Sequence, residues 1–273
     1  VALTKNGKLC RIFIDRAGDK SVVDGIYWGR ITRINKGLDA AFIDIGMEDM
    51  GFLAAADAQT FDHARERPIP IGQLFTEGRN VLVQVTRDPQ NGKGAKLTTL
   101  LDISTANIVI TPWRPGNLVS KHVEEPSARE RLEEILEEIA EVDAGFVAKS
   151  LAIYSSRETL MREAHMLSQD WEYIKALMKV RKSPAVLLEP PEPILRFFWD
   201  IYDGGLKRIV VEGRQFYQEI LQVLKYRFPE LLSVVKLHES TDEIFTTHDL
   251  TEQWENVYSK MVMLPSGGSL IIE

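Results

Sequence analysis

Cysteine is almost absent from this chain, because Cys10 is the single example in 273 residues. One thiol excludes an internal disulfide framework and any multi-thiolate metal site built from this chain alone. Long apolar runs are lacking as well, since runs such as VLVQV and RIVVE are short and interrupted by charges, whereas a membrane-spanning helix needs about 20 apolar residues in a row. We therefore expect a soluble protein of the reducing cytoplasm with no membrane span.

An excess of positive charge is also missing. The 33 lysines and arginines are outnumbered by 40 acidic residues, which gives a formal net charge of −7. Such a chain does not coat nucleic acid through bulk electrostatics, so any nucleic-acid binding requires a local patch. The hydrophobic content of 44% is ordinary for a globular protein and predicts a sizeable core in two or three compact units.

An initiator methionine is not present, and the chain opens directly on a strand-like run, so we expect a fragment. Apolar residues alternate on both sides of Asn6-Gly7, which predicts a β-hairpin. Five short strand-like segments follow up to residue 103 and predict a small antiparallel barrel. They are IYWGRITRI, AAFIDIG, MGFLAA, RNVLVQVTRD and KGAKLTTLLDI. Residues 57–72, rich in proline and charge, are predicted to form a loop.

The composition changes after Thr111, where PWRPGN interrupts the strand-like pattern. Apolar residues at helical spacing predict helices over 126–139 and 156–182, with a strand at GFVAKS between them. This region is typical of a small α+β unit. After the strand-like SPAVLLE, helix and strand patterns alternate as in α/β proteins, at residues 194–202, 207–212, 214–228 and 234–238.

The block DGIYWGRITRINKGLDAAFIDIGMEDMGFL carries aromatic and basic residues on neighbouring predicted strands. In an OB-type barrel, outward aromatic rings stack on bases while cations follow the phosphates. The residues that could act in this way are Tyr27, Phe42, Phe52, Arg30, Arg33 and Lys36. The alternative interpretation is that one or more of these rings simply belong to the barrel core.

The pattern IYxGxxTRI…xAAFxDxGxxxxGFL resembles the S1-type RNA-binding barrel of the bacterial ribonuclease E/G family, and QNGKGAKLTT is similar to the segment that closes this barrel. GFVAKSLA, DWEYI, KSPAVLLE and MLPSGGSLIIE follow in the family's order and spacing. The resemblance covers nearly the whole chain. It implies an α+β multidomain fold, in which an RNase H-like α/β domain is split between 1–22 and 194–273. An S1-type OB-fold barrel at 23–103 and a small α+β 5′-sensor unit at 104–193 are inserted between the two parts.

The resemblance also implies which residues bind RNA. In the family, two barrel phenylalanines and a lysine contact RNA, and the matching residues here are Phe42, Phe52 and Lys93. Tyr27 and Arg30 of the same predicted barrel complete the set of candidate RNA-binding residues. Lys93 lies between Gly92 and Gly94, which we expect to let the backbone approach a phosphate closely. The alternative is an ordinary solvated lysine in a turn.

In the family, a pocket for the RNA 5′-monophosphate is formed by an Arg-Thr pair and by a glycine and a valine from an earlier strand. The matching residues here are Lys149 and Ser150 for the pair, Thr105 for the glycine and Val109 for the valine. Lysine lacks the bidentate guanidinium fork, and Thr105 adds bulk where a backbone amide should approach. We therefore expect weak sensing of the 5′ end. The alternative is that Lys149 and Ser150 form a solvated strand end.

The LPSGG segment leads, in the family, to the first metal-binding aspartate of a DNase I-like domain, but this chain ends at Glu273. We therefore expect no catalytic and no metal-binding residue within it, and Mg²⁺ only in the parent enzyme. The resulting hypothesis is the RNA-binding portion of a Mg²⁺-dependent endoribonuclease that acts on single-stranded RNA in RNA processing or decay. The alternatives are a noncatalytic single-stranded RNA-binding or scaffold protein, and a structural piece that forms a homo-oligomer.

Overall fold

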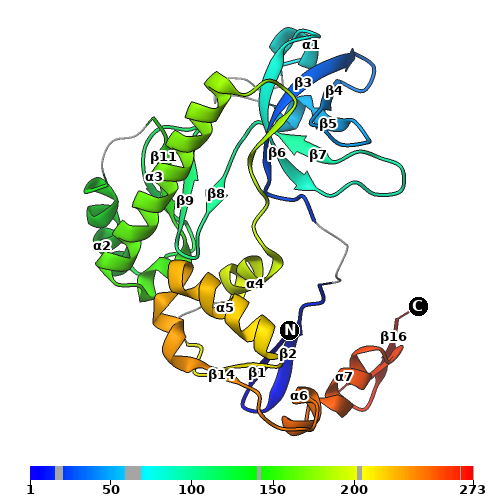
Figure 1. Ribbon diagram of the computed structural model, residues 1–273, viewed down its shortest axis with the longest axis vertical. Coiled ribbons are helices and arrows are strands. Elements are labelled where there is room, and N and C mark those ends of the chain that lie inside the picture. Colours follow the sequence, from blue (N-terminus) through cyan, green and yellow to red (C-terminus); the bar gives the residue numbers. More distant parts are fainter. Residues whose placement is uncertain (16–20, 59–68, 140–142, 202–204, 265, 273) are drawn as a thin grey trace. The chain divides into compact units, whose positions relative to one another are not determined.

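The computed structural model describes residues 1–15, 21–58, 69–139, 143–201, 205–264 and 266–272 (Figure 1). The chain divides into two compact units. The smaller unit combines the two ends of the chain, Val1–Asp19 and Gly205–Glu273, and the larger unit is Lys20–Gly204. Most of the loop expected over residues 57–72 lies outside the described residues.

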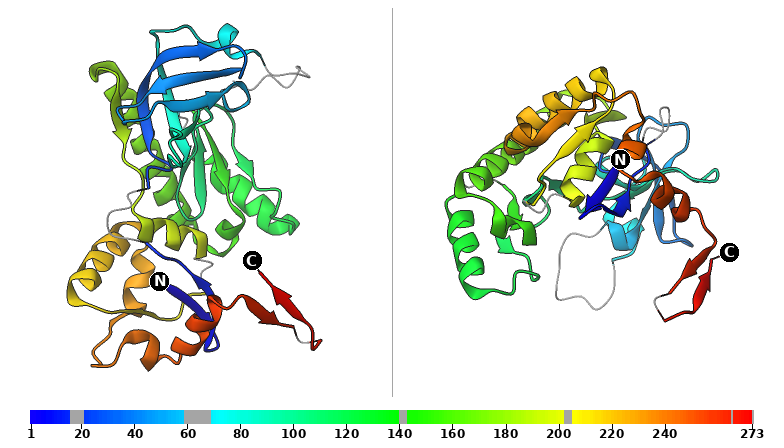
Figure 2. Two further views of the ribbon diagram at one scale, coloured as in Figure 1. Left: turned by 90° about the vertical axis from the view of Figure 1, so that its right-hand side faces the viewer. Right: turned by 90° about the horizontal axis from the view of Figure 1, so that it is seen from below.

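A closed five-stranded barrel forms the first part of the larger unit (Figures 1 and 2). Its strands pair in the order β3-β4-β5-β7-β6, and pairing between β3 and β6 closes the ring. The strands are β3 (Ile26–Asn35), β4 (Ala40–Asp44), β5 (Gly51–Ala54), β6 (Asn80–Arg87) and β7 (Lys96–Thr98). The predicted barrel is therefore confirmed, and the arrangement fits an OB-fold.

The barrel interior is filled by the inward-facing side chains of alternate strand positions. Ile31, Ile43, Leu53, Val83 and Leu97 are buried there. Burying each such side chain stabilises the fold by about 1.5–3 kcal/mol. Two short helical segments, η1 (Ala55–Asp57) and α1 (Ile71–Leu74), contribute further buried residues to the same core.

The first residues of β3 are buried on both faces of the strand. Along one edge, this part of β3 pairs with β12 (Ala185–Leu188), which extends the barrel sheet by a sixth strand. Ile26 belongs to the core shared with the helices, whereas the next residue, Tyr27, belongs to the barrel core. Successive side chains of a strand point to opposite faces, so both faces of β3 are buried at this position.

The second part of the larger unit is a four-stranded sheet with helices packed on it (Figure 1). The strands follow the order β10 (Leu118–Val119), β11 (Gly145–Ala148), β9 (Ile108–Thr111) and β8 (Ile103–Ser104). The helices are α2 (Pro126–Glu137) and α3 (Arg157–Val180), which confirms the two predicted helices, with the short turn η2 (Ser150–Tyr154) before α3.

Helix α3 begins at a regular N-cap, because the Ser156 hydroxyl accepts a hydrogen bond of 3.2 Å from the Thr159 amide. Its apolar stripe, which includes Leu160, Leu167 and Ile174, is buried in a core shared with α2 and the sheet. Helix α4 (Pro193–Ile201) closes the larger unit, where Arg196 donates to the Ser21 hydroxyl at 2.9 Å.

The smaller unit contains the predicted N-terminal hairpin, β1 (Ala2–Lys5) and β2 (Lys8–Ile12). Asn6 and Gly7 both have positive φ, 54° and 76°, which the two-residue turn requires. The predicted α/β alternation is confirmed by β13 (Ile209–Val211), helix α5 (Arg214–Arg227) and β14 (Val235–Leu237), with β13 parallel to β14. The turn η3 (Pro229–Val234) precedes β14.

The last part of the smaller unit consists of two short helices and a hairpin. They are α6 (Ile244–Thr247), α7 (Thr251–Val257), β15 (Met261–Met263) and β16 (Ser269–Ile271). Gln253 of α7 ties this segment to the N-terminal hairpin, because its side-chain oxygen accepts a hydrogen bond of 2.8 Å from the Leu9 amide. The two ends of the chain therefore fold together in one unit.

Candidate functional site

An aromatic pair lies on the outer surface of the barrel. Phe42 of β4 and Phe52 of β5 are direct cross-strand partners, and both rings are partly exposed. Their centroids are 5.9 Å apart with an interplanar angle of 73°, an edge-to-face contact. The pair therefore presents an accessible aromatic surface on two neighbouring strands.

Cations lie on both sides of this aromatic pair. Arg33 of β3 is opposite Phe42, and its guanidinium carbon lies 4.5 Å from the centre of the Phe42 ring. On the other side Lys96 of β7 is opposite Phe52 and forms an ion pair of 2.9 Å with Asp57. The arrangement is a row of cation, ring, ring and cation across four strands, about 14 Å long at the usual strand spacing.

Lys93 lies at the end of the β6–β7 hairpin and is exposed. Gln90 and Lys93 exchange two backbone hydrogen bonds of 3.0 and 2.9 Å around Asn91-Gly92, whose φ values of 53° and 70° are both positive. Gly94 lies against the backbone of Met50, so a Cβ at this position would be only 1.9 Å from the Met50 oxygen. The turn and this close contact are sufficient to explain both glycines, and the close approach of a phosphate to this backbone stays a prediction.

Tyr27 and Arg30 differ in exposure. The Tyr27 side chain is 3% exposed and belongs to the barrel core, so the expectation that its ring faces outward to stack on a base is wrong. Burial, together with the Glu189 and Asp88 carboxylates, raises the pKa of its hydroxyl. Arg30 is exposed on β3, opposite Asp44 of β4.

The residues expected to form the 5′-end pocket lie close together on the second sheet. The Lys149 ammonium donates a hydrogen bond of 2.7 Å to the Thr105 carbonyl oxygen. Lys149 follows β11, and Ser150 begins η2 directly after it. Val109 lies on the adjacent strand β9, paired with Val147 of β11. Thr105 is 3% exposed, so its side chain is part of the interior rather than of an open pocket wall.

A buried carboxylate fixes the turn that carries Thr105. Glu163 of α3 is 4% exposed and accepts three hydrogen bonds. They come from the Thr105 hydroxyl at 2.5 Å, the Asn107 amide at 3.1 Å and the Asn107 side chain at 2.9 Å. Burial raises the pKa of Glu163, although these hydrogen bonds and the Arg162 charge oppose the shift. The same turn holds the Lys149 amide, which donates to the Asn107 carbonyl at 2.7 Å.

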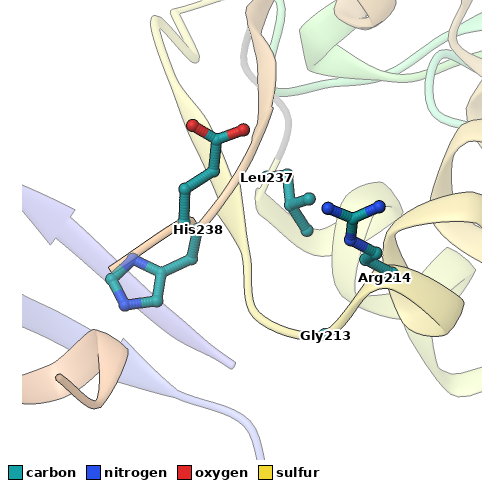
Figure 3. A pocket seen from close by; sticks show the side chains of 5 residues that line it. Gly213, Arg214, Leu237 and His238 are labelled. Carbon is teal, nitrogen blue, oxygen red and sulfur yellow. The ribbon is translucent and has the colours of Figure 1, made fainter. Parts of the chain in front are cut away.

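A separate pocket of about 290 Å³ opens in the smaller unit, where the carboxyl ends of β13 and β14 meet the start of α5 (Figure 3). It is lined by Gly213, Arg214, Leu237, His238 and Glu239. The walls carry charges of both signs, and His238 Nε2 lies 2.7 Å from the Asp242 carbonyl oxygen. This mixture does not favour one class of ligand.

Metal-binding geometry is not found in the described part of the chain. Among these residues, no group of three or more His, Cys, Asp or Glu side chains could hold a metal ion. No helix among them is long and apolar enough to cross a membrane.

Comparison with known proteins identifies the family. Residues 103–273 match the model of the Ribonuclease E/G family. This chain belongs to the ribonuclease E/G family. Ribonuclease G of Haemophilus influenzae is 30% identical over 282 residues, and ribonuclease G of Escherichia coli K12 is 29% identical over 280. Ribonuclease E of Escherichia coli K12 is 27% identical over 282 residues. All three matches cover 100% of this chain.

The chain spans only part of the length of its relatives in the ribonuclease E/G family. The match covers 57% of either ribonuclease G and 26% of the Escherichia coli ribonuclease E. A solved structure, the solution structure of GSP13 from Bacillus subtilis, matches 29% of this chain and 56% of its own at 19% identity, with a TM-score of 0.24.

Two features of this ribonuclease E/G chain are not evident from its sequence. Glu163 is not distinguished by any local pattern, because its partners Thr105 and Asn107 are 56 to 58 residues away in the sequence. The contact of Arg33 with the Phe42 ring depends on the register between β3 and β4, which residue types alone do not define.

Proposed function

We propose that this chain is the RNA-binding portion of an endoribonuclease, and that its barrel binds single-stranded RNA through Phe42, Phe52, Lys93 and Arg30. The observation that carries the proposal is the partly exposed Phe42–Phe52 pair with cations on both sides. Aromatic rings at such positions stack on bases, and each stacked base contributes about 1–3 kcal/mol to binding. Stacking tolerates any base, so the barrel binds with little sequence preference.

The same geometry favours single strands over duplex. Bases in a duplex are stacked on each other and their faces are not accessible, whereas unpaired bases can lie on Phe42 and Phe52. The net charge of −7 provides no general attraction for phosphates. Binding therefore depends on local cations at the barrel surface, among which Lys93 and Arg30 are exposed.

The proposal extends to the rest of the architecture. The two ends of the chain, 1–22 and 194–273, correspond to a split RNase H-like domain, with the barrel at 23–103 and a 5′-sensor unit at 104–193 inserted. The resemblance in sequence supports these assignments. In the 5′-sensor unit, Lys149, Ser150 and Val109 line the position of the RNA 5′ end, and the carbonyl of the buried Thr105 accepts a hydrogen bond from Lys149. Because Lys149 replaces a guanidinium fork, this unit discriminates weakly between 5′ ends.

The parent enzyme cleaves single-stranded RNA with Mg²⁺ in the cytoplasm, in RNA processing or decay. The relatives named ribonuclease G and ribonuclease E support this activity, and they are longer than the present chain. When Mg²⁺ is bound by carboxylates, it activates water for in-line attack on a phosphodiester. The second candidate function is a noncatalytic single-stranded RNA-binding protein, which the exposed aromatic pair favours equally.

A competition titration tests the proposed function. A fluorescein-labelled single-stranded RNA of about 12 nucleotides, within the usual size range of an OB-fold site, is bound to the chain and followed by anisotropy. Unlabelled single strand should displace it at a concentration at least about tenfold below that of a duplex of the same length. Equal competition by single strand and duplex contradicts the proposal.

A further inference from the structure

Arg33 faces the barrel surface because of an irregularity in β3. The register of β3 and β4 shifts between Ile31 and Arg33, so Thr32 is the extra residue of a β-bulge. In a regular strand Arg33 would point to the same face as Ile31, which is buried in the barrel core. The bulge turns Arg33 outward instead, opposite Phe42.

The bulge is held in place by a side-chain hydrogen bond. The Thr32 hydroxyl donates to the Phe42 carbonyl oxygen at 3.0 Å, so the extra residue is bonded to the strand that carries the ring. Arg33 is exposed, and its guanidinium lies over the ring at 4.5 Å. The guanidinium therefore contacts the Phe42 ring, while the Arg33 side chain stays accessible to a ligand.

The charge of Arg33 is available for a ligand. Among the described residues, no carboxylate lies within ion-pair distance of Arg33, whereas Lys96, at the other end of the row, is paired with Asp57 at 2.9 Å. A planar guanidinium can stack on a base with one face while its N–H groups donate to a phosphate. Lysine can replace the charge but not the plane.

We infer that Arg33 is an RNA-contacting residue that forms the second layer of the stacking surface, with Phe42 beneath it and an RNA base above it. Its N–H edge then donates to the phosphate next to that base. The inference rests on the proposed single-stranded RNA binding by the barrel and adds a residue that selects for unpaired bases. It requires both the plane and the charge of Arg33, and it requires Phe42 as support.

The test uses Arg33→Ala, Arg33→Lys and Phe42→Ala in the full chain, with a fluorescein-labelled oligouridylate of about 12 nucleotides as the probe. Arg79→Ala is the matched control, because Arg79 is an exposed arginine of the same barrel, just before β6. Circular dichroism confirms that each variant keeps its fold. Dissociation constants are measured by anisotropy at several salt concentrations.

We expect Arg33→Ala to weaken binding about fivefold or more and to reduce the salt slope by about 0.7. Arg33→Lys should keep the slope and still weaken binding about threefold or more, because the plane is lost. Arg79→Ala should stay within about twofold of wild type. In the Phe42→Ala background, replacing Arg33 by alanine should lose most of its effect, since the two side chains act together.

The other outcomes separate the inference from the proposed function. If Phe42→Ala weakens binding while both Arg33 variants stay within about twofold of wild type, Arg33 does not contact RNA and only this inference fails. If Arg33→Lys binds as wild type, Arg33 acts as a charge alone and the stacking role is overturned. If Phe42→Ala binds as wild type, the proposed function fails, and the inference fails with it.

Discussion

The Glu163 carboxylate accepts a hydrogen bond of 2.5 Å from the Thr105 hydroxyl, and both side chains are buried. This contact joins helix α3 to the turn between β8 and β9, which also holds Asn107. Lys149 depends on the same turn, because its ammonium donates to the Thr105 carbonyl at 2.7 Å. The buried Glu163 therefore fixes the turn that positions Lys149, the charged side chain expected at the 5′-end pocket.

Removing this acid should destabilise the larger unit. Glu163→Ala leaves the Asn107 amide and the Asn107 side chain without their acceptor in a buried position, whereas the Thr105 hydroxyl can still donate to the Ile108 carbonyl at 3.0 Å. Each buried donor left unsatisfied costs about 1–3 kcal/mol, so we expect a loss of about 2 kcal/mol or more in the free energy of unfolding. Urea denaturation measures it, and Glu130→Ala on the exposed face of α2 is the control. A loss below about 1 kcal/mol contradicts the account.

The same acid gives a pH dependence with a defined sign. Burial raises the pKa of Glu163 above its ordinary value of 4.5, so the folded chain binds this proton more tightly than the unfolded chain does. The stability due to this group is therefore fully present below the ordinary value and is lost as pH rises through the folded-state pKa. The melting temperature of wild type minus that of Glu163→Gln should thus fall as pH increases from about 4 to 8. A difference that rises with pH would falsify this assignment.

Gly94 should tolerate no side chain. A Cβ there would be 1.9 Å from the Met50 oxygen, a backbone atom that cannot rotate away. We expect Gly94→Ala to destabilise the barrel by about 1–3 kcal/mol, the usual cost of overpacking. Gly72→Ala is the control, because its Cβ would be 3.9 Å from the nearest atom, the Ile34 side chain. Thermal melts of the two variants should differ clearly, and equal melting temperatures would show that the close contact is absent in solution.

Discrimination between 5′ ends should be weak. Lys149 provides a point charge that already donates to the Thr105 carbonyl, and it lacks a bidentate fork for a monophosphate. The dissociation constants of 5′-monophosphate and 5′-hydroxyl RNA of the same sequence should differ by less than about tenfold. Paired anisotropy titrations decide this, and a larger difference that disappears in Lys149→Ala would show that a working pocket exists.

Local signals predicted much of the fold. Asn6-Gly7 indicated the hairpin because both residues tolerate positive φ, and the alternating segments indicated the five barrel strands. The burial of Tyr27 was not predictable in this way, because the strand pattern does not say which face of β3 points into the barrel core, and Tyr27 lies on that inner face. The strand at residues 185–188 was predicted, but its pairing with the barrel was not.

The candidate binding surface was predictable in part. The positions of Phe42 and Phe52 on neighbouring strands follow from the strand pattern and from the family resemblance. Their flanking by Arg33 and Lys96 follows from the register, which the bulge at Thr32 shifts by one residue. A shift of one residue moves a side chain to the other face of a strand, so the sequence could name Arg33 as a candidate cation but could not place it against Phe42.

The central claim is that the Phe42–Phe52 pair binds single-stranded RNA, and one titration tests it most directly. The affinity of wild type and of Phe42→Ala/Phe52→Ala for a labelled single-stranded RNA is measured by anisotropy at equal salt. We predict that the double variant, still folded by circular dichroism, binds at least about tenfold more weakly, because one stacked base contributes about 1–3 kcal/mol. A folded double variant with the affinity of wild type would contradict the account.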